Sequence, residues 1–490
     1  MTMAIKYFTR YRHIAPLAVL RIAFGAVLFI STIRFIARGW VHDFYIVPRF
    51  HFPFYGFSWV QPMGSTGMYT LYLVMALAAL FICLGLFYRI AAPLFFLCFA
   101  YAELLDKTYY LNHYYFVTIC SFLLILVPAH RYCSLDSLRK PSLKVTQVPA
   151  WTILLFKYQL CIVYICAGLS KLTQDWLFNA MPLKIWLPAK ASVPLIGPLL
   201  RYEWTAYFFS WAGALFDLSI VFLLLGRPTR RIGYVLVIVF HLLTAVLFQI
   251  GMFPWLMMSA TIIFFSEDFH TGLIRKTRTL LSRKGAFPEP STKPLQKLGP
   301  QPSPKQAPTQ MPDPHPSSKS GSVPTSEPPL YFQTRNPKIL FPLLGLYFLL
   351  QLVLPFRYLL YPGNLLWTEE GYRFSWRVML MEKGGATFFY VKDPATGKKF
   401  EVNNSAYLTP YQERMMETQP DMMLQYAHIL KRQYQQQGIA SPEVTVQSFV
   451  TLNGNGSRLY IDSTVNLAEE QESWFGHKKW ILSFTNNPLR

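Results

Sequence analysis

The chain has 490 residues, of which 52% are hydrophobic, 17% aromatic and only 14% charged, whereas a soluble domain has about 25% charged residues. This composition excludes a wholly soluble protein, because so much apolar surface needs a bilayer as its solvent. The net charge of +21 disfavours nucleic acid as a partner all the same, because Lys and Arg mostly flank apolar runs or lie in one linker.

Nine apolar runs are close to the length of about 20 helical residues that a hydrocarbon core of ~30 Å requires. Gly251 and Pro254 favour a break between the seventh and eighth runs, although a single span with a re-entrant piece is the alternative. The sequence therefore predicts an α-helical polytopic membrane protein with about nine transmembrane helices. The runs lie at 14–36, 68–88, 90–106, 111–129, 149–170, 204–226, 232–250, 251–266 and 339–360.

The basic residues predict the orientation of these helices. Lys and Arg precede the first run and follow the second, fourth, sixth and eighth, so these loops are expected in the cytoplasm. The loops at 38–67, 107–111 and 171–203 are then expected outside, as is everything after the ninth run. Residues 271–337 are first basic and then Pro-rich, which predicts a disordered cytoplasmic linker between a bundle at 1–270 and the last transmembrane helix at 338–362.

Residues 363–490 have a different pattern, and we expect them to form a small β-rich extracytoplasmic domain. Segments such as ATFFYVKD at 386–393 and VTVQSFVTL at 444–452 are typical of antiparallel strands, and 409–437 predicts a helix with a Thr cap. An α+β fold and a β-sandwich both fit this pattern. All six cysteines precede residue 167 and show no metal-type Cys-x-x-Cys spacing, so the domain folds without disulfides and no metal site is expected.

Polar side chains inside apolar runs cost about 3 kcal/mol each and are candidates for function. Each also has a structural alternative. In these alternatives, Arg21 would pair with a carbonyl or a carboxylate, and Asp217 would be its partner or would form a hydrogen bond between helices. His241 would be a satisfied core residue, Lys171 would extend to the outer interface, and Asn112 with His113 would form an interfacial cap. By themselves the candidates indicate a polar pocket near the outer leaflet but no particular reaction. They are Arg21, Asn112, His113, Lys171, Asp217 and His241.

Five segments carry a resemblance to a known family: LGLFYRI (84–90), LDKTYYLNHYYF (105–116), QLCIVYICAGLSKLTQDWL (159–177), FHLLTAVLFQIGMF (240–253) and WTEEGYRFSW (367–376). They resemble the vitamin K-dependent γ-glutamyl carboxylases, within the broader family of horizontally transferred transmembrane domains. Ser170 stands where animal members have a second lysine, and the C-terminal domain is shorter and lacks cysteine. These departures indicate a bacterial-type homologue, which places the protein in an inner membrane.

The resemblance implies a chemistry for the polar pocket. In that family a deprotonated lysine at the position of Lys171 takes a proton from vitamin K hydroquinone. Oxygen addition then yields a base that removes the γ-proton of Glu, and the carbanion captures carbon dioxide. Burial of a lysine favours the neutral amine that this role needs. His113 and Asn112 match family residues beside the reacting centre, where preorganised donors supply ~3 kcal/mol. Four further residues are implied to hold the quinol: His241, Met252, Phe253 and Tyr110.

The expected function is therefore γ-carboxylation of glutamate in a protein or peptide, coupled to quinol epoxidation. The expected cofactor is vitamin K hydroquinone or menaquinol, with O2 and CO2 as co-substrates and no metal; the other partners are membrane lipid and quinol. One alternative is a quinol epoxidase or oxidase of the same fold without carboxylation, which also needs Lys171. The other is a non-enzymatic membrane scaffold, which has no use for Lys171, Asn112 and His113 together.

Overall fold

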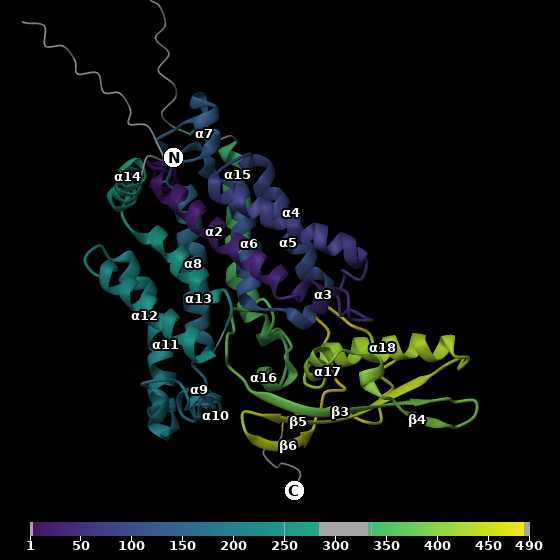
Figure 1. The fold of residues 1–490 in the computed structure, drawn as a ribbon. Helices are drawn as coiled ribbons and strands as arrows, with labels where there is room; N and C mark the ends of the chain where they lie inside the picture. The colour runs from purple at the N-terminus through teal and green to yellow at the C-terminus, as the bar shows by residue number, and fades with distance from the viewer. Residues whose placement is uncertain (1–2, 249, 284–331, 335, 485–490) are drawn as a thin grey trace, which may run out of the picture.

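The computed structural model describes residues 3–248, 250–283, 332–334 and 336–484, which form a helical bundle and a C-terminal α+β domain (Figure 1). The N-terminus, α7 (Leu135–Arg139) and α14 (Glu267–Arg283) gather at one end of the bundle, and the C-terminal domain packs against the other end. The predicted Pro-rich part of the linker lies outside the described residues, whereas the basic stretch from 271 to 283 continues the helix α14.

Seven helices in the described chain are long and apolar enough to cross a membrane. Two shorter apolar helices, α6 and α13, occupy the fourth and eighth predicted runs. The predicted polytopic helical fold is confirmed. The seven are α2 (Ala15–Ala37), α4 (Gly64–Leu84), α5 (Tyr88–Leu105), α8 (Trp151–Ser170), α11 (Glu203–Leu225), α12 (Arg230–Phe248) and α15 (Pro337–Val353), which the 3-10 helix η7 (Leu354–Leu360) extends; the shorter two are α6 (Asn112–Leu126) and α13 (Phe253–Thr261), which η6 (Ile262–Phe264) extends.

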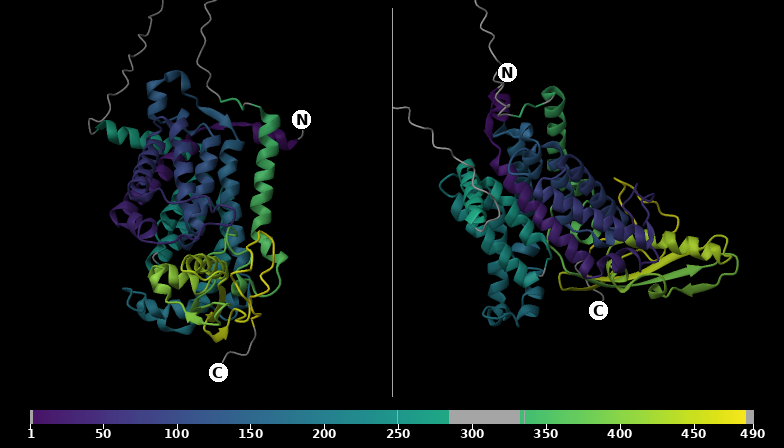
Figure 2. Two further views of the ribbon diagram at one scale, coloured as in Figure 1. Left: turned by 90° about the vertical axis from the view of Figure 1, so that its right-hand side faces the viewer. Right: turned by 45° about the horizontal axis from the view of Figure 1, so that its top comes forward.

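The break between the seventh and eighth runs lies at Gly251, whose φ of 62° is the left-handed conformation that glycine adopts at little cost. The separate helices α12 and α13 follow from this turn. Much of the helical surface is apolar and faces outward: only 17% of α15 and 28% of α12 is buried, and α15 stands at the edge of the bundle (Figure 2, left). Such exposure is expected where lipid is the solvent.

Arg21 is fully buried in α2 and is bound entirely by backbone carbonyls at the end of the bundle that holds the N-terminus. Two of its acceptors belong to the last turn of α4, where carbonyls lack the partner four residues on that they would have inside a helix. Arg21 therefore has the structural role that the sequence left open, with a carbonyl rather than a carboxylate partner. It donates at 2.6 to 3.1 Å to the carbonyl oxygens of Ile82, Cys83, Ala129 and Cys133.

Short elements connect the long helices. An antiparallel pair of strands ties the N-terminal segment to the segment before α8. The short elements are α1 (Met3–Thr9), β1 (Tyr11–His13), α3 (Trp40–Tyr45), η1 (Lys107–Tyr109), η2 (Ala129–Arg131), η3 (Pro141–Leu143), β2 (Gln147–Pro149), α9 (Gln174–Leu177), α10 (Leu183–Trp186), η4 (Pro188–Lys190) and η5 (Gly197–Arg201).

The C-terminal domain is one four-stranded antiparallel sheet in the order β4-β3-β5-β6, covered on one face by two helices. Phe389 of β3 is fully buried and packs its ring 4.7 Å from that of Tyr426 in α18. The expected α+β fold is confirmed, because the described residues of this domain, 363–484, form one sheet and not the two of a β-sandwich. The elements are α16 (Leu365–Thr368), β3 (Lys383–Lys392), β4 (Lys399–Glu401), η8 (Asn404–Ala406), α17 (Pro410–Met416), α18 (Pro420–Gln436), β5 (Glu443–Leu452) and β6 (Asn455–Leu459).

The helix predicted at 409–437 forms as two helices, because Pro420 lacks a backbone N–H donor and occupies the first turn of α18. The expected Thr cap is present: the hydroxyl of Thr409 accepts from the backbone N–H of Gln412, whose side chain bonds back to the N–H of Thr409. This reciprocal capping box fixes where α17 begins.

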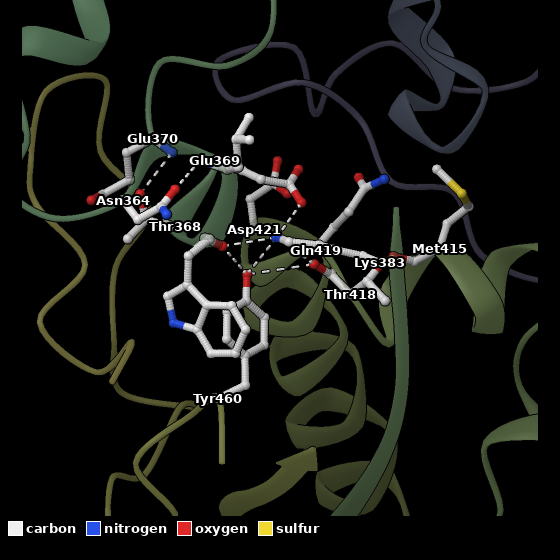
Figure 3. Close-up of polar contacts among 12 residues, drawn as sticks. Asn364, Thr368, Glu369, Glu370, Lys383, Met415, Thr418, Gln419, Asp421 and Tyr460 are labelled. Carbon is white, nitrogen blue, oxygen red and sulfur yellow. Dashed lines mark hydrogen bonds and ion pairs between the residues drawn. The ribbon is translucent and has the colours of Figure 1, made fainter. Parts of the chain in front are cut away.

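Lys383 holds the segment after the last span against the sheet (Figure 3). Its ammonium donates to Glu369 Oε1 at 2.7 Å and to the carbonyl of Trp367 at 2.8 Å, and it lies 3.2 Å from the hydroxyl of Tyr460. Burial lowers the pKa of Lys383, and the nearby Glu369 carboxylate opposes that shift. The contacts fix residues 365–370 at the base of the sheet, so the chain that follows has a defined starting point.

The loop after α5 joins the bundle to the C-terminal domain. Asp106 accepts from the side-chain amide of Gln412 at 3.1 Å, and the buried Lys107 ammonium lies 2.9 Å from Asp421 Oδ2. Burial alone would raise the pKa of Asp421, but the cations of Arg373 and Lys107 hold it well below its usual range. The Asp and Lys of the LDK segment therefore dock the two domains together.

Candidate functional site

A cavity of about 430 Å³ lies among α8, α11, α12 and α13, close to the C-terminal domain. Its walls are mostly aromatic and aliphatic, and its few polar side chains come from different helices. Three residues of the C-terminal domain, Trp376, Val378 and Met379, complete the wall. The polar side chains in the wall include Asn112, Tyr164, Lys171, Asp217, His241 and Thr244.

Lys171 is the residue that ends α8, and its ammonium faces Asp217 in the middle of α11. Lys171 Nζ lies 2.7 Å from Asp217 Oδ2 and 3.3 Å from the carbonyl oxygen of Ala167. It also lies 5.5 Å from the ring centroid of Trp176. Only 6% of Lys171 and 5% of Asp217 is exposed. Lys171 therefore points into the protein, rather than to the membrane interface, and Asp217 forms a bond between helices.

The close approach of α8 and α11 depends on Gly168. A Cβ atom at this position would lie 2.7 Å from the side chain of Leu218 on α11, so a larger residue would push the helices apart. Small residues at helix contacts in membranes allow this kind of approach. The Ala-Gly-x-x-Lys-Leu segment thus places a lysine one turn after the glycine that brings its carboxylate partner within reach.

His241 of α12 lies on the same cavity and is bound on one side only. Its Nε2 is 3.1 Å from the hydroxyl of Tyr164 on α8, whereas its buried Nδ1 has no hydrogen-bond partner among the described residues. The ring of Phe253 lies 5.5 Å from His241 and 5.7 Å from His113, measured between centroids. Phe253 therefore separates the two histidines and lines the cavity itself.

His113 and Met252, which the sequence places at the site, lie beside the cavity rather than in its wall. His113 contacts Phe253 from behind, and Met252 faces a separate cavity of about 40 Å³ that also holds Arg34 and Glu103. The reason is geometric, because successive helical residues point in different directions. Asn112 and Phe253 reach the cavity, and their immediate neighbours do not.

Asn112 and Tyr110 bind residues 374–379, the segment that closes the cavity and is called the closing segment below. Asn112 Nδ2 donates to the carbonyl oxygen of Arg377 at 2.6 Å, and Tyr110 donates its hydroxyl proton to Asn112 Oδ1 at 3.1 Å. The Tyr110 oxygen accepts in turn from the backbone N–H of Phe374 at 2.8 Å. Tyr110 does not line the cavity, so the structure gives it a supporting position behind Asn112.

The closing segment has a strained backbone. Phe374, Trp376 and Met379 have φ values of 62°, 59° and 58°, and a non-glycine residue in this region costs about 1–2 kcal/mol. Packing holds the segment in place: the Trp376 ring stacks on Tyr115 at 4.8 Å. The sequence predicts neither the strained backbone of this segment nor its contact with the cavity. The one sequence feature that indicates its importance is the family resemblance of residues 367–376.

A second pocket of about 190 Å³ lies beside the chain that leads into the closing segment. Residues 368–371, 373 and 374 form part of its wall. In contrast to the first, its wall is rich in charged side chains. Arg357, in the middle of η7, has a buried Nε that lacks a hydrogen-bond partner among the described residues. The charged side chains in the wall are Lys107, Arg357, Glu369, Glu370, Arg373, Asp421, Glu472 and Lys478.

Two family models match the chain, and together they cover both parts of the site. The HTTM domain matches residues 9–269, which hold Lys171, Asp217 and His241. The lumenal domain of vitamin K-dependent gamma-carboxylase matches residues 336–487, which hold Arg357 and the closing segment. No solved structure matches the chain. The chain, a multi-pass membrane protein, therefore belongs to the HTTM-domain family and, through the lumenal domain that follows, to the family of the vitamin K-dependent γ-glutamyl carboxylases.

Proposed function

We propose that this protein carboxylates the γ-carbon of glutamate residues in a protein or peptide and couples this step to the epoxidation of a quinol. Quinol, O2, CO2 and glutamate would give quinone epoxide, water, γ-carboxyglutamate and a proton. The observation that carries the proposal is the Lys171–Asp217 pair in the wall of an apolar cavity.

The cavity suits a quinol by size and by chemistry. Ligand pockets of about 300–1,000 Å³ with mainly aromatic walls and few polar groups are typical of small-molecule sites, and this cavity has about 430 Å³. Phe216, Phe240 and Phe253 offer flat surfaces to an aromatic ring. His241 is in the wall of the cavity, so its imidazole offers a polar group to a ligand hydroxyl or carbonyl. When bound, the quinol would supply, with O2, the strong base that removes the γ-proton of glutamate.

Lys171 would take the first proton, and Asp217 would make this possible. A lysine that carries three protons cannot act as a base, but transfer of one proton to Asp217 leaves a neutral amine beside a neutral acid. The net charge of the pair does not change in this transfer. The short distance of 2.7 Å lets the transfer take place along an existing hydrogen bond.

Asn112 and His113 would support the reaction from the side of the cavity that faces the C-terminal domain. Asn112 lines the cavity and fixes the closing segment through Arg377. His113 acts through Phe253, against which it packs, so we assign it a positioning role. The closing segment and the aromatic wall exclude water, which protects a carbanion from simple reprotonation.

The charged pocket favours carboxylation over epoxidation alone. An epoxidase needs one apolar site, whereas a carboxylase must also hold an anionic glutamate side chain. Arg357 is a cation in the wall of that pocket, and a carboxylate is the ligand that a guanidinium binds best. One continuous stretch of chain lines both pockets, residues 368–374 the charged one and residues 376–379 the apolar one, so it would connect a bound glutamate with the quinol site.

The test is an assay of the purified protein in a bilayer with vitamin K hydroquinone, labelled bicarbonate and a Glu-rich peptide. Epoxide and fixed label are measured separately, and the Lys171→Ala variant is the control for background oxidation. Formation of both products supports the carboxylase. Epoxide without label would leave the epoxidase of the same fold, and neither product, with menaquinol also tried, would contradict an enzymatic role.

A further inference from the structure

The helix α14 lies at the end of the bundle farthest from the C-terminal domain and runs across the direction of the spanning helices (Figure 2, left). Its first turn is anchored: Glu267 accepts from the backbone N–H of His13 at 2.9 Å and pairs with Arg12 at 3.4 Å. His270 is fully buried against the bundle. The helix is therefore held in place at one end of the membrane part.

The outward surface of α14 is amphipathic. At about 100° per residue, Phe269, Leu273 and Leu280 fall within about 40° of one another on the helix. Their exposed fractions are 40%, 38% and 62%, although each is a large apolar side chain. Exposed apolar side chains in a row are stabilised by contact with an apolar environment. For a helix at the end of a membrane bundle, the nearest such environment is the acyl chains of the adjoining leaflet.

The rest of the exposed surface is cationic. Arg275 and Arg278 lie on the face opposite the apolar row, and Lys276 lies at its edge, where a long side chain can reach past apolar atoms to a charged layer. None of the three forms an ion pair with another described residue. The only acidic residues of the helix, Glu267 and Asp268, are in its first turn.

Neighbouring elements at the same end continue this pattern. Leu138 of α7 is 68% exposed, and Arg139, Lys140 and Lys144 are exposed close to it in sequence. Arg139 pairs with Asp136 at 3.7 Å. Apolar side chains beside exposed cations match the boundary between acyl chains and phosphate groups. A protein partner would need a shaped complementary surface, whereas a straight apolar row flanked by long basic side chains fits a plane.

We propose that α14 is an interfacial helix that binds anionic phospholipid, with Phe269, Leu273 and Leu280 in the acyl-chain boundary and Arg275, Lys276 and Arg278 on the phosphate groups. The site is at the opposite end of the bundle from the C-terminal domain and is independent of the proposed reaction. Through its anchor on residues 12 and 13, it would hold this end of the bundle at a fixed depth in the leaflet.

The test uses the full-length protein in uncharged detergent micelles, titrated with dansyl-labelled phosphatidylglycerol while energy transfer from tryptophan is recorded. The variant Arg275→Gln/Lys276→Gln/Arg278→Gln should bind the lipid about a hundredfold more weakly, because each cation near an anionic surface is worth roughly fivefold. Salt should weaken binding by the wild type, because exposed charges are screened. The matched control, Lys398→Gln/Lys399→Gln/Arg432→Gln, removes three exposed cations from the C-terminal domain and should bind like the wild type.

A second variant, Leu273→Gln/Leu280→Gln, tests the apolar row without a change in charge and should also bind more weakly. The three cations and the two leucines are all exposed, so thermal unfolding of each variant should match that of the wild type. The proposal is overturned if the wild type binds dansyl-phosphatidylcholine as tightly as dansyl-phosphatidylglycerol. It is equally overturned if the α14 charge variant and the control variant bind the anionic lipid alike.

Discussion

Lys171 Nζ lies 2.7 Å from Asp217 Oδ2, and both side chains are buried in the membrane part of the protein. Two charges in such a place cost several kcal/mol of desolvation, and breaking a buried pair by removing one partner costs about 3–5 kcal/mol. A bond that costly to maintain is a poor choice for stability alone. It is a good choice if a proton must move between the two groups, and this consequence can be tested.

Asp217→Asn should lower both epoxide formation and carbon dioxide fixation by about 10²- to 10⁴-fold, the usual contribution of a proton-accepting group. The amide has nearly the same shape but cannot take a proton. Asp217→Glu keeps the carboxylate and should recover part of the rate. Thermal unfolding of both variants separates loss of chemistry from loss of fold. A fully active Asp217→Asn enzyme would remove Asp217 from the proton path.

Arg357→Gln should weaken carboxylation and leave quinol epoxidation largely intact. If the guanidinium binds the substrate carboxylate, its loss removes a charge-assisted bond worth about 1.5–3 kcal/mol, which is roughly a ten- to hundredfold rise in the KM for a Glu-rich peptide. Trp376→Ala is the contrasting variant, because it opens the cavity wall and should lower both activities. Equal effects of Arg357→Gln on both products would contradict a glutamate site in the charged pocket.

The contact between Lys107 and Asp421 should make the docking of the C-terminal domain sensitive to acid. The pKa of Asp421 is lowered when folded, so its contribution to stability is complete above the unfolded pKa of about 3.9 and is lost as pH falls through the folded value. Asp421→Asn should destabilise the domain by about 3–5 kcal/mol at neutral pH. Glu443→Gln, which breaks the exposed Lys392–Glu443 pair, should cost less than about 1 kcal/mol. Chemical unfolding compares the two; equal losses would contradict the role of the buried pair.

Fusion proteins can test on which side of the membrane the linker and the C-terminal domain lie. A reporter joined after Asn364 should score outside the cytoplasm, and one joined within 286–337 should score inside, because short basic loops stay in the cytoplasm. The helix between the two points, Pro337–Leu360, is long and apolar enough to span. If both reporters score on the same side, this helix does not cross the membrane.

The positions of the spanning helices can be predicted from the sequence, because the length of an apolar run is a local property that the bilayer selects. Which polar groups meet is not local. From the sequence, Asp217 could pair with Arg21 or bridge two helices. Its partner is Lys171 because α8 packs closely on α11 at Gly168. The resemblance names Tyr110 and Met252 as quinol ligands, but it carries no information on the direction of each side chain. The closing segment lies outside such reasoning altogether, because its left-handed residues are stabilised by contacts distant in sequence.

Lys171→Ala should abolish both epoxide formation and carbon dioxide fixation at neutral pH, because the variant has lost the amine that starts the cycle. Small added amines should restore part of the rate, since the cavity that the side chain leaves can admit them. Lys171→Arg keeps a cation beside Asp217 and preserves the ion pair, but a guanidinium stays protonated in proteins and cannot act as a base. It should therefore be well folded and inactive, which separates the structural role of the pair from its chemical one. If Lys171 served only to hold α8 against α11, Arg would replace it, and an active Lys171→Arg enzyme would end the mechanism proposed here.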